Sequence, residues 1–309
     1  MHARSVSATH RRTLHELRTL IKQKGQSELA FKCISSGVDF HLQIHERIRN
    51  PLNVRQGNTP LCGPAAFMHC VAKYFPDHYE QYALELALFG KSRLGDLVVE
   101  PSESCRNARD GLSLRTEGHH FSAPDWVTLA SIRDSSNAFS RMSGPGSNVA
   151  GMTFPGALIG WFEDTGLFAK VENHTSTVVT SSYDNLLRAN EKLKAGHCVC
   201  LLIQGSILAP MAGIELGASK FQKDTPKIAA PLPNHWVVQV SQMLIGHKPA
   251  PRPGLSAVNS TYNSSLQFDM HSWGADGKAY PVNARVADIS PEEFTRYYHG
   301  FVCAKPRLD

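Results

Sequence analysis

The pattern of apolar residues changes at Gly196, and this change constrains the fold more than any other feature of the chain. Before Gly196, apolar residues recur at spacings of three and four, which is typical of helices packed on a core. After it, short alternating or continuous apolar runs are typical of strands. Helices and strands segregated along the chain in this way predict an α+β fold.

Most of the expected elements have recognisable ends, such as a proline in the first turn, a capping residue or a closing glycine. Helices are expected over residues 11–24, 62–75, 79–89, 125–132 with Asp125 as the cap, 155–163, and 183–195 with Ser182 as the cap. Strands are expected over residues 197–203, 236–240, 266–273 and 279–283.

The positive charge of the chain is concentrated at its start. Residues 1–50 hold nine Lys and Arg against four Asp and Glu, which accounts for the whole formal net charge of +5. We therefore distinguish a basic helical segment, 1–50, from a domain over 51–309, in which 51–195 is mainly helical and 196–309 mainly β. The basic residues are not interleaved with aromatic ones, so nucleic-acid binding is not expected.

Composition also sets several classes of protein aside. The sequence contains no run of about 18 apolar residues, so no membrane span is predicted. The first residues lack the apolar stretch of a secretory signal peptide. The seven cysteines are scattered and odd in number, unlike a disulfide framework. Cys198 and Cys200 alternate on one strand, but no second pair completes a zinc site, and no metal or other cofactor is expected. A reducing cytoplasm is the simplest setting.

The segment Gln56-Gly-Asn-Thr-Pro-Leu-Cys62 places a side-chain amide one short loop before a thiol at the start of an expected helix. Backbone N–H groups and the helix dipole at such a position lower the pKa of a thiol and favour the nucleophilic thiolate. A glutamine beside it can donate to the oxyanion that forms when the thiolate attacks a carbonyl. The alternative is a buried helix cysteine after a Gly/Pro loop.

A cysteine nucleophile requires a base, and among fifteen histidines His235 has the best local reason to be one. It opens a well-formed strand after a proline-rich loop, so it is expected at a sheet edge. On the next expected strand, Asp269 and His271 are two residues apart and share a face, so either can orient the imidazole. A dyad without an orienting residue is also open. Trp273 is placed to lie against the imidazole and exclude water.

The order and chemistry of three short motifs resemble those of the papain-like cysteine peptidases: Gln56 six residues before Cys62-Gly63, then Asn234-His235-Trp236, then His271-Ser-Trp273-Gly274. The resemblance implies a two-lobe fold, with the nucleophile helix in a helical N-terminal lobe and an antiparallel sheet in the C-terminal lobe. It also implies a protease that acts through an acyl-enzyme, with Cys62 as nucleophile, His235 as base, Gln56 as oxyanion donor, and Gly63 and Trp273 beside the substrate.

Two features depart from this family. Position 271 is His where the family has Asn, and Gly-Pro-Ala-Ala follows Cys62 where the family has Gly-Ser-Cys-Trp, which is closer to bacteriocin-processing peptidases and bacterial papain-fold toxins. Residues 125–134 and 151–156 also resemble papain-fold effectors of bacterial contact-dependent (type VI) secretion. That resemblance implies a protein substrate, a cognate immunity protein as inhibitor, a secretion carrier, and delivery into the cytosol of a target cell.

Other functions remain open from the sequence. A protein glutamine deamidase uses the same Cys–His machinery, and peptidoglycan amidases of the NlpC/P60 type share the Cys–His–His order. The amidases usually have Asp before the nucleophile, where Leu61 stands here. A papain-like scaffold with an inert Cys62 would be a binding protein. Binding through the basic segment 1–50 would instead be sensitive to salt.

Overall fold

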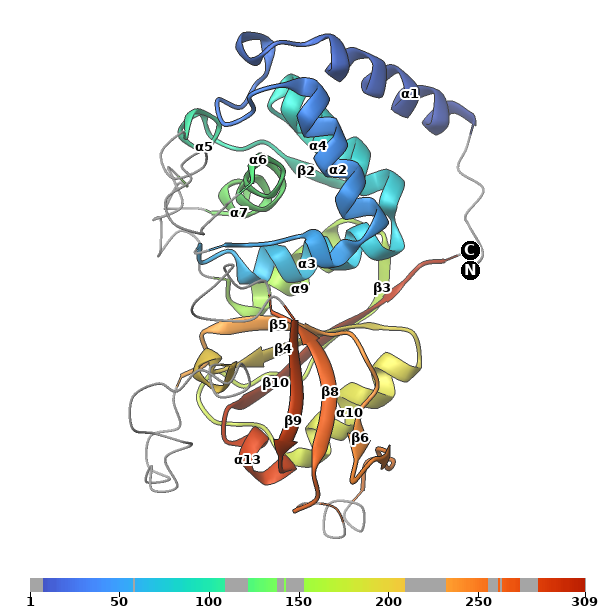
Figure 1. Ribbon diagram of the computed structural model, residues 1–309, viewed down its shortest axis with the longest axis vertical. Helices are drawn as coiled ribbons and strands as arrows, with labels where there is room; N and C mark the ends of the chain where they lie inside the picture. Colours follow the sequence, from blue (N-terminus) through green and yellow to red (C-terminus); the bar gives the residue numbers. More distant parts are fainter. Residues whose placement is uncertain are drawn as a thin grey trace. The chain divides into compact units, whose positions relative to one another are not determined.

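A computed structural model describes residues 8–57, 59–108, 122–137, 142, 153–208, 232–254, 261, 263–272 and 283–308. The chain forms two compact units. We call Met1–Phe168 with Arg307–Asp309 the helical unit, and Ala169–Pro306 the sheet unit. Figure 1 shows that helices dominate the first and strands the second, which confirms the α+β prediction. None of the described helices has the length and apolarity needed to cross a bilayer.

The helical unit follows the predicted helices closely and adds short elements between them. Its elements are α1 (Ala8–Gln23), η1 (Gln26–Glu28), α2 (Gly37–Arg49), η2 (Pro51–Asn53), α3 (Cys62–Tyr74), α4 (Pro76–Phe89), β1 (Ser92–Leu94), β2 (Leu97–Val99), α5 (Glu103–Asn107), α6 (Ala123–Asp125), η3 (Trp126–Ala130), α7 (Ser131–Ser135) and α9 (Pro155–Asp164). The expected helices over 11–24, 62–75, 79–89 and 155–163 are therefore confirmed. The prediction did not include α2, although Ser36 caps it by accepting from the backbone N–H of Asp39.

Asp125 does not cap a helix, so that prediction is wrong. Ser122 is the cap of α6, and its hydroxyl accepts from the backbone N–H of Asp125. Asp125 is instead 1% exposed, and its carboxylate forms a bidentate ion pair with Arg47 of α2, with N···O distances of 2.9 and 2.6 Å. It also accepts from the backbone N–H of Arg55 at 3.3 Å. A charged cap would be exposed, whereas this carboxylate joins three separate segments inside the unit.

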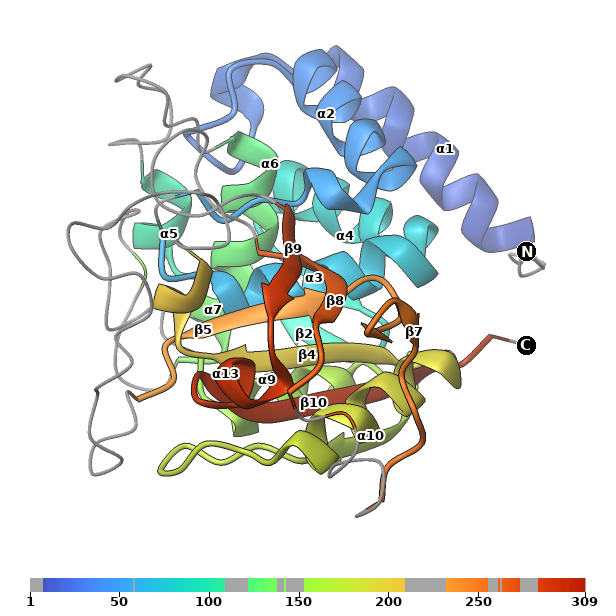
Figure 2. The same ribbon diagram turned by 60° about the horizontal axis from the view of Figure 1, so that its bottom comes forward.

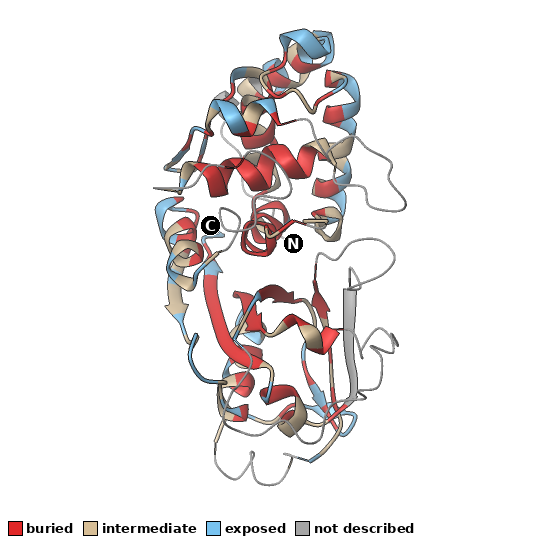
Figure 3. Ribbon diagram, turned by 90° about the vertical axis from the view of Figure 1, so that its left-hand side faces the viewer, coloured by how far each residue is buried: buried red, intermediate tan, exposed pale blue. Residues whose placement is uncertain are grey.

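The core of the helical unit is built around α3. Every residue from Cys62 to Ala72 is buried, and Figure 3 shows this helix buried almost throughout its length. Phe67 on α3 packs edge-on against Phe162 of α9, with ring centroids 5.1 Å apart, and Phe162 packs against Phe168 at 4.8 Å. Edge-to-face aromatic pairs add specificity to apolar burial. This packing holds the helix that begins with Cys62.

The sheet unit contains an eight-stranded sheet among its described residues. Its elements are β3 (Phe168–Asn173), α10 (Tyr183–Lys194), β4 (Cys198–Ile203), η4 (Gly205–Ile207), β5 (His235–Gln239), β6 (Leu244–Ile245), β7 (Lys248–Pro249), β8 (Leu266–His271), β9 (Asn283–Ile289), α13 (Pro291–Thr295) and β10 (Tyr298–Pro306). The strand order is β3-β10-β4-β5-β8-β6-β7, and β9 pairs with β8 (Figure 2). Each pairing of β4, β5, β6 and β8 is antiparallel.

The predicted strands over 197–203, 236–240 and 266–273 are confirmed as far as His271. Most of the strand expected over 279–283 lies outside the described residues. The helix expected over 183–195 is α10, and Ser182 caps it as predicted. Its apolar face, with Leu186 and Leu187, lies in the same core cluster as Leu201 and Val237 of the sheet.

The two units meet in the sequence at residues 168 and 169 rather than at 195 and 196. The physical reason is that α10 buries its apolar face in the core of the sheet unit, although its sequence is helical. The basic segment 1–50 is likewise not separate from α1 onward, because Arg47 in it pairs with Asp125 inside the helical unit.

Breaking the ion pair between Arg47 and Asp125 tests its structural role. Asp125→Ala leaves a buried guanidinium without its carboxylate, so we expect the free energy of unfolding to fall by about 3–5 kcal/mol. Arg188→Ala is the matched control, because Arg188 pairs with Asp184 at an exposed i, i+4 position on α10, and its loss should stay below about 0.5 kcal/mol. Denaturant unfolding measures both, and equal losses would contradict the assignment.

Candidate functional site

Cys62 is the first residue of α3, and its position has the features that the sequence predicted. No side chain caps this helix terminus, and the first turn contains no acidic residue. The first backbone N–H to bond within the helix is that of Ala65, which donates to Leu61 O at 2.9 Å. The Cys62 residue is 7% exposed. A helix N-terminus without an acidic neighbour favours a thiolate there.

Gly63 is required by packing as well as by the motif. A Cβ built on Gly63 would lie 2.4 Å from Cβ and Cγ2 of Thr153, a separation at which neighbouring atoms must move. The start of α3 at Gly63 therefore packs tightly against Thr153, in the segment that leads into α9. The structure accounts for Gly63 without reference to a substrate.

Gln56 lies in a turn that precedes the helix. The backbone N–H and the hydroxyl of Thr59 both donate to the Gln56 carbonyl, at 3.2 and 2.6 Å, and Gly57 has a positive φ of 55°. The side-chain Oε1 of Gln56 is buried and accepts no hydrogen bond from the described residues. A buried amide oxygen of this kind can accept a hydrogen bond from a ligand or from a water molecule.

Three other thiols in the chain, those of Cys33, Cys105 and Cys303, are poorly suited to act as nucleophiles. Burial raises the pKa of Cys33 and of Cys303 to about 12. Burial also raises the pKa of Cys105 well above its ordinary value. These three thiols are therefore protonated at neutral pH, and protonated thiols are poor nucleophiles.

His235 opens β5, as predicted, and is held from two sides. Within the sheet it stands opposite Ile203 of β4. On its other side, the Asn234 side chain accepts from the backbone N–H of Gly205 at 2.8 Å. A Cβ on Gly205 would lie 3.3 Å from the His235 Cβ, so this glycine leaves room for the imidazole. The position of the ring is therefore set by the backbone around it.

The hydrogen bond of His235 determines which of its nitrogens is basic. Nε2 lies 3.1 Å from the carbonyl oxygen of Ser272 and 3.4 Å from the Ser272 hydroxyl. A carbonyl only accepts, so Nε2 carries the proton and donates it, and Nδ1 of the neutral ring has the lone pair. Burial lowers the His235 pKa to about 4, and the bond to Ser272 opposes that shift. At neutral pH His235 is thus an uncharged base with a defined tautomer.

Sequence reasoning missed Ser272, the residue that contacts Nε2. Phe268 and Met270 of β8 face the core cluster of the sheet unit, so alternation puts Asp269 and His271 on the opposite face. His271 is fully buried and stands opposite Val238 of β5. The contact with Ser272 involves a main-chain carbonyl, which every residue has, so no residue type in the sequence could have signalled it.

The structure brings the predicted site residues together in two groups. Gln56, Cys62 and Gly63 belong to one continuous segment of the helical unit. His235 and His271 belong to adjacent strands of the sheet unit. Trp273 lies outside the described residues. Comparisons with models of protein families, with curated proteins and with solved structures found no match for this chain.

The fit of Gly63 can be tested with a second glycine as control. We expect Gly63→Ala to lower the free energy of unfolding by about 1–3 kcal/mol, because its methyl group overlaps Thr153. Gly156→Ala on α9 meets no atom within 4 Å and should instead stabilise the helix by about 0.5–1 kcal/mol. Thr153→Gly should restore part of the loss in a Gly63→Ala background. Denaturant unfolding of wild type and the three variants measures this, and equal stability of Gly63→Ala and wild type would refute the fit.

The low pKa of His235 predicts a pH dependence with a definite sign. Between pH 6.5, the ordinary pKa of a histidine, and about pH 4, its pKa in the folded chain, the unfolded chain binds a proton at His235 and the folded chain does not. Stability therefore falls as pH falls through this window, by about 3 kcal/mol for this group alone. His235→Asn should lose less stability than wild type between pH 7 and pH 4.5. NMR titration should place the His235 midpoint near 4, and a midpoint above 6 would contradict the burial argument.

Proposed function

We propose that this chain is a papain-like cysteine hydrolase, most simply a protease, in which Cys62 is the nucleophile and His235 the general base. The observation that carries the proposal is the tautomer of His235. A buried neutral imidazole whose Nε2 donates to Ser272 O has its basic lone pair on Nδ1. Holding a histidine in one tautomer, so that its basic nitrogen is defined, is what a catalytic base requires.

The reaction then proceeds in two balanced steps. Cys62 Sγ attacks the carbonyl carbon of a peptide bond while its proton passes to Nδ1 of His235. The imidazolium returns that proton to the leaving amine, the C–N bond breaks, and a thioester remains on Cys62. Water then attacks the thioester while His235 takes one proton from it. The C–S bond breaks, the imidazolium returns that proton to the Cys62 sulfur, and the acid and the free thiol are released.

The oxyanion of each tetrahedral intermediate needs donors that are in place beforehand. We assign these to the backbone N–H of Cys62, at the start of α3, and to the side-chain amide of Gln56. In favour of Gln56 is the turn that fixes its backbone, in which the Thr59 hydroxyl donates to the Gln56 carbonyl.

The departure from the family at position 271 does not weigh against this proposal. The family orients its histidine with an asparagine side chain, whereas here the contact of His235 Nε2 is with the main chain and hydroxyl of Ser272. A main-chain carbonyl supplies the same acceptor whatever side chain stands beside it. The proposed enzyme thus orients its base without the residue that the family uses.

The proposal extends to the finer fold and to the setting. The helical unit corresponds to the papain lobe with the nucleophile helix, and the sheet unit to the lobe with the base. The resemblance to papain-fold effectors supports delivery as a toxin into the cytosol of a competing cell, a secretion carrier, and a cognate immunity protein that covers the site. These partners are part of the proposal and rest on the resemblance.

Mass spectrometry of a bacterial lysate tests the proposed function. Lysate treated with wild type should gain new peptide N-termini, whereas Cys62→Ala should yield none, because the nucleophile is gone. Cys33→Ala is the matched control; its thiol is protonated at neutral pH because burial raises its pKa to about 12, so full turnover is expected. His235→Ala should lose activity on the order of 10²–10⁴-fold.

The other outcomes of this experiment identify other functions. Glutamines that gain about one dalton without new termini would indicate a deamidase, and products seen only with purified peptidoglycan would indicate an amidase. If no substrate reacts, the pH dependence of Cys62 alkylation is compared in wild type and His235→Ala, to test whether Cys62 and His235 act as a nucleophile–base pair. A profile that is the same in both would refute the nucleophile–base pair and favour a binding protein.

A further inference from the structure

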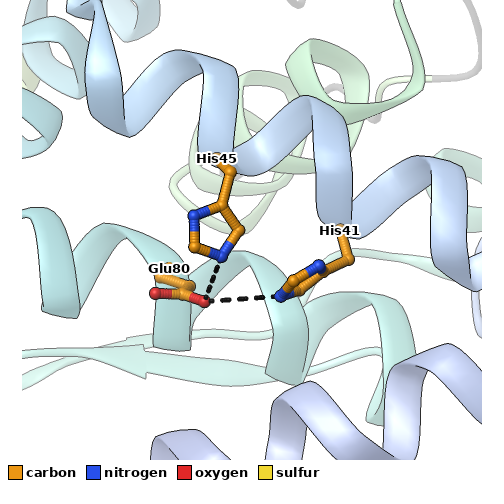
Figure 4. Close-up of side chains that lie close together, drawn as sticks. All are labelled: His41, His45 and Glu80. Carbon is orange, nitrogen blue, oxygen red and sulfur yellow. Dashed lines mark ion pairs between the residues drawn. The ribbon is translucent and has the colours of Figure 1, made fainter.

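A second group of titratable side chains lies in the helical unit, apart from Cys62 and His235. His41 and His45 are one helical turn apart on α2 and point toward Glu80 of α4 (Figure 4). Their Nε2 atoms lie 3.8 and 3.4 Å from Glu80 Oε1. Glu80 is 1% exposed and His41 6% exposed. The sequence analysis did not identify this group.

His41 lacks the partners that a buried imidazole needs. Neither Nδ1 nor Nε2 has a hydrogen-bond partner among the described residues, although both atoms are buried. Polar atoms buried without a partner are costly and rare in native proteins. Its Nε2 lies 3.8 Å from Glu80 Oε1, a distance too long for a hydrogen bond. The ring is therefore aimed at the carboxylate with space between them.

The separations suit a small cation placed between the three side chains. One ligand atom from each of His41, His45 and Glu80 lies within 4.8 Å of the other two. Bonds of about 2.0–2.1 Å to a tetrahedral Zn²⁺ put neighbouring ligand atoms roughly 3.3 Å apart. The observed 3.4 and 3.8 Å are close to that value, so small rotations of the rings complete the geometry.

The protonation state of His41 is compatible with metal binding. Burial, and then the positive charges of His45 and Lys22, lower its pKa to about 4. A neutral imidazole has the lone pair that a metal ligand must offer. It also means that His41 and Glu80 do not form an ordinary ion pair at neutral pH.

Arg18 of α1 determines which kind of cation fits. Its Nε and Nη2 donate to the two Glu80 oxygens, both at 2.6 Å, which orients the carboxylate as second-sphere groups do in metal sites. Arg18 also cancels most of the carboxylate charge. Hard cations such as Ca²⁺ and Mg²⁺ depend on that charge, whereas Zn²⁺ binds strongly to imidazole.

We propose that His41, His45 and Glu80 form a binding site for a divalent ion of the zinc type, coordinated by the two Nε2 atoms and Glu80 Oε1. The His45 side chain is 33% exposed, so water can reach the site and complete a tetrahedral shell. Such an ion ties α2 to α4. The proposal uses no residue of the proposed hydrolase site, so either can fail without the other.

Calorimetric titration of the full chain with Zn²⁺ tests the site. We use a Cys62→Ala background, so that zinc bound to a reactive thiol does not obscure the result. The Cys62→Ala parent, with His41, His45 and Glu80 unchanged, should bind one equivalent of Zn²⁺. Adding His45→Gln should weaken the affinity for Zn²⁺ by about a hundredfold or more. His45 is partly exposed, so this variant should fold. His15→Gln, an exposed histidine on the neighbouring α1, is the matched control and should bind as tightly as the parent.

Co²⁺ in place of Zn²⁺ identifies the ligands. The spectrum should show the visible bands of tetrahedral cobalt without the near-ultraviolet charge-transfer bands of thiolate ligands, and His45→Gln should abolish it. Glu80→Gln should also weaken binding, with circular dichroism as the check on its fold. Absence of stoichiometric binding, thiolate bands, or equal affinity in parent and His45→Gln would each overturn the proposal.

Discussion

The buried ion pair between Arg47 and Asp125 is the interaction on which the arrangement of the helical unit depends. It connects α2 to α6, and the same carboxylate accepts from the backbone of Arg55, just before the turn that contains Gln56. The start of the segment that carries Gln56 and Cys62 is thus bound, through the backbone N–H of Arg55, to the buried carboxylate of Asp125. Such a pair costs desolvation energy, and removing either partner leaves an uncompensated charge inside the unit.

Two buried histidines show how local partners decide the chemistry of the same side chain. His235 has a carbonyl on Nε2, which fixes one tautomer and leaves Nδ1 as a base. His41 has no hydrogen-bond partner among the described residues and faces a carboxylate at 3.8 Å, beside a second imidazole. Burial lowers the pKa of both to about 4, so neither is charged at neutral pH. The first arrangement suits proton transfer and the second suits a metal ion.

The residues that the sequence identified best were those whose local pattern is tied to backbone geometry. Cys62 begins its helix and His235 opens its strand as expected, because proline, glycine and alternating apolar residues mark such ends locally. Asp125 was misassigned because a carboxylate near a helix start resembles a cap, and its partner Arg47 is far away in sequence. His41 and His45 are four residues apart, but the prediction did not include the helix α2 that carries them, and nothing local pointed to Glu80.

The sequence by itself determined the α+β class, the boundaries of most helices and strands, and the candidates Cys62 and His235, because hydrophobic periodicity and end signals act over a few residues. Only the tertiary structure decided that α10 belongs with the sheet, that Ser272 contacts the imidazole of His235, and that Arg18 and Glu80 lie beside His41. These facts depend on contacts between residues distant in the chain and on main-chain atoms common to all residues, and neither leaves a local mark in the sequence.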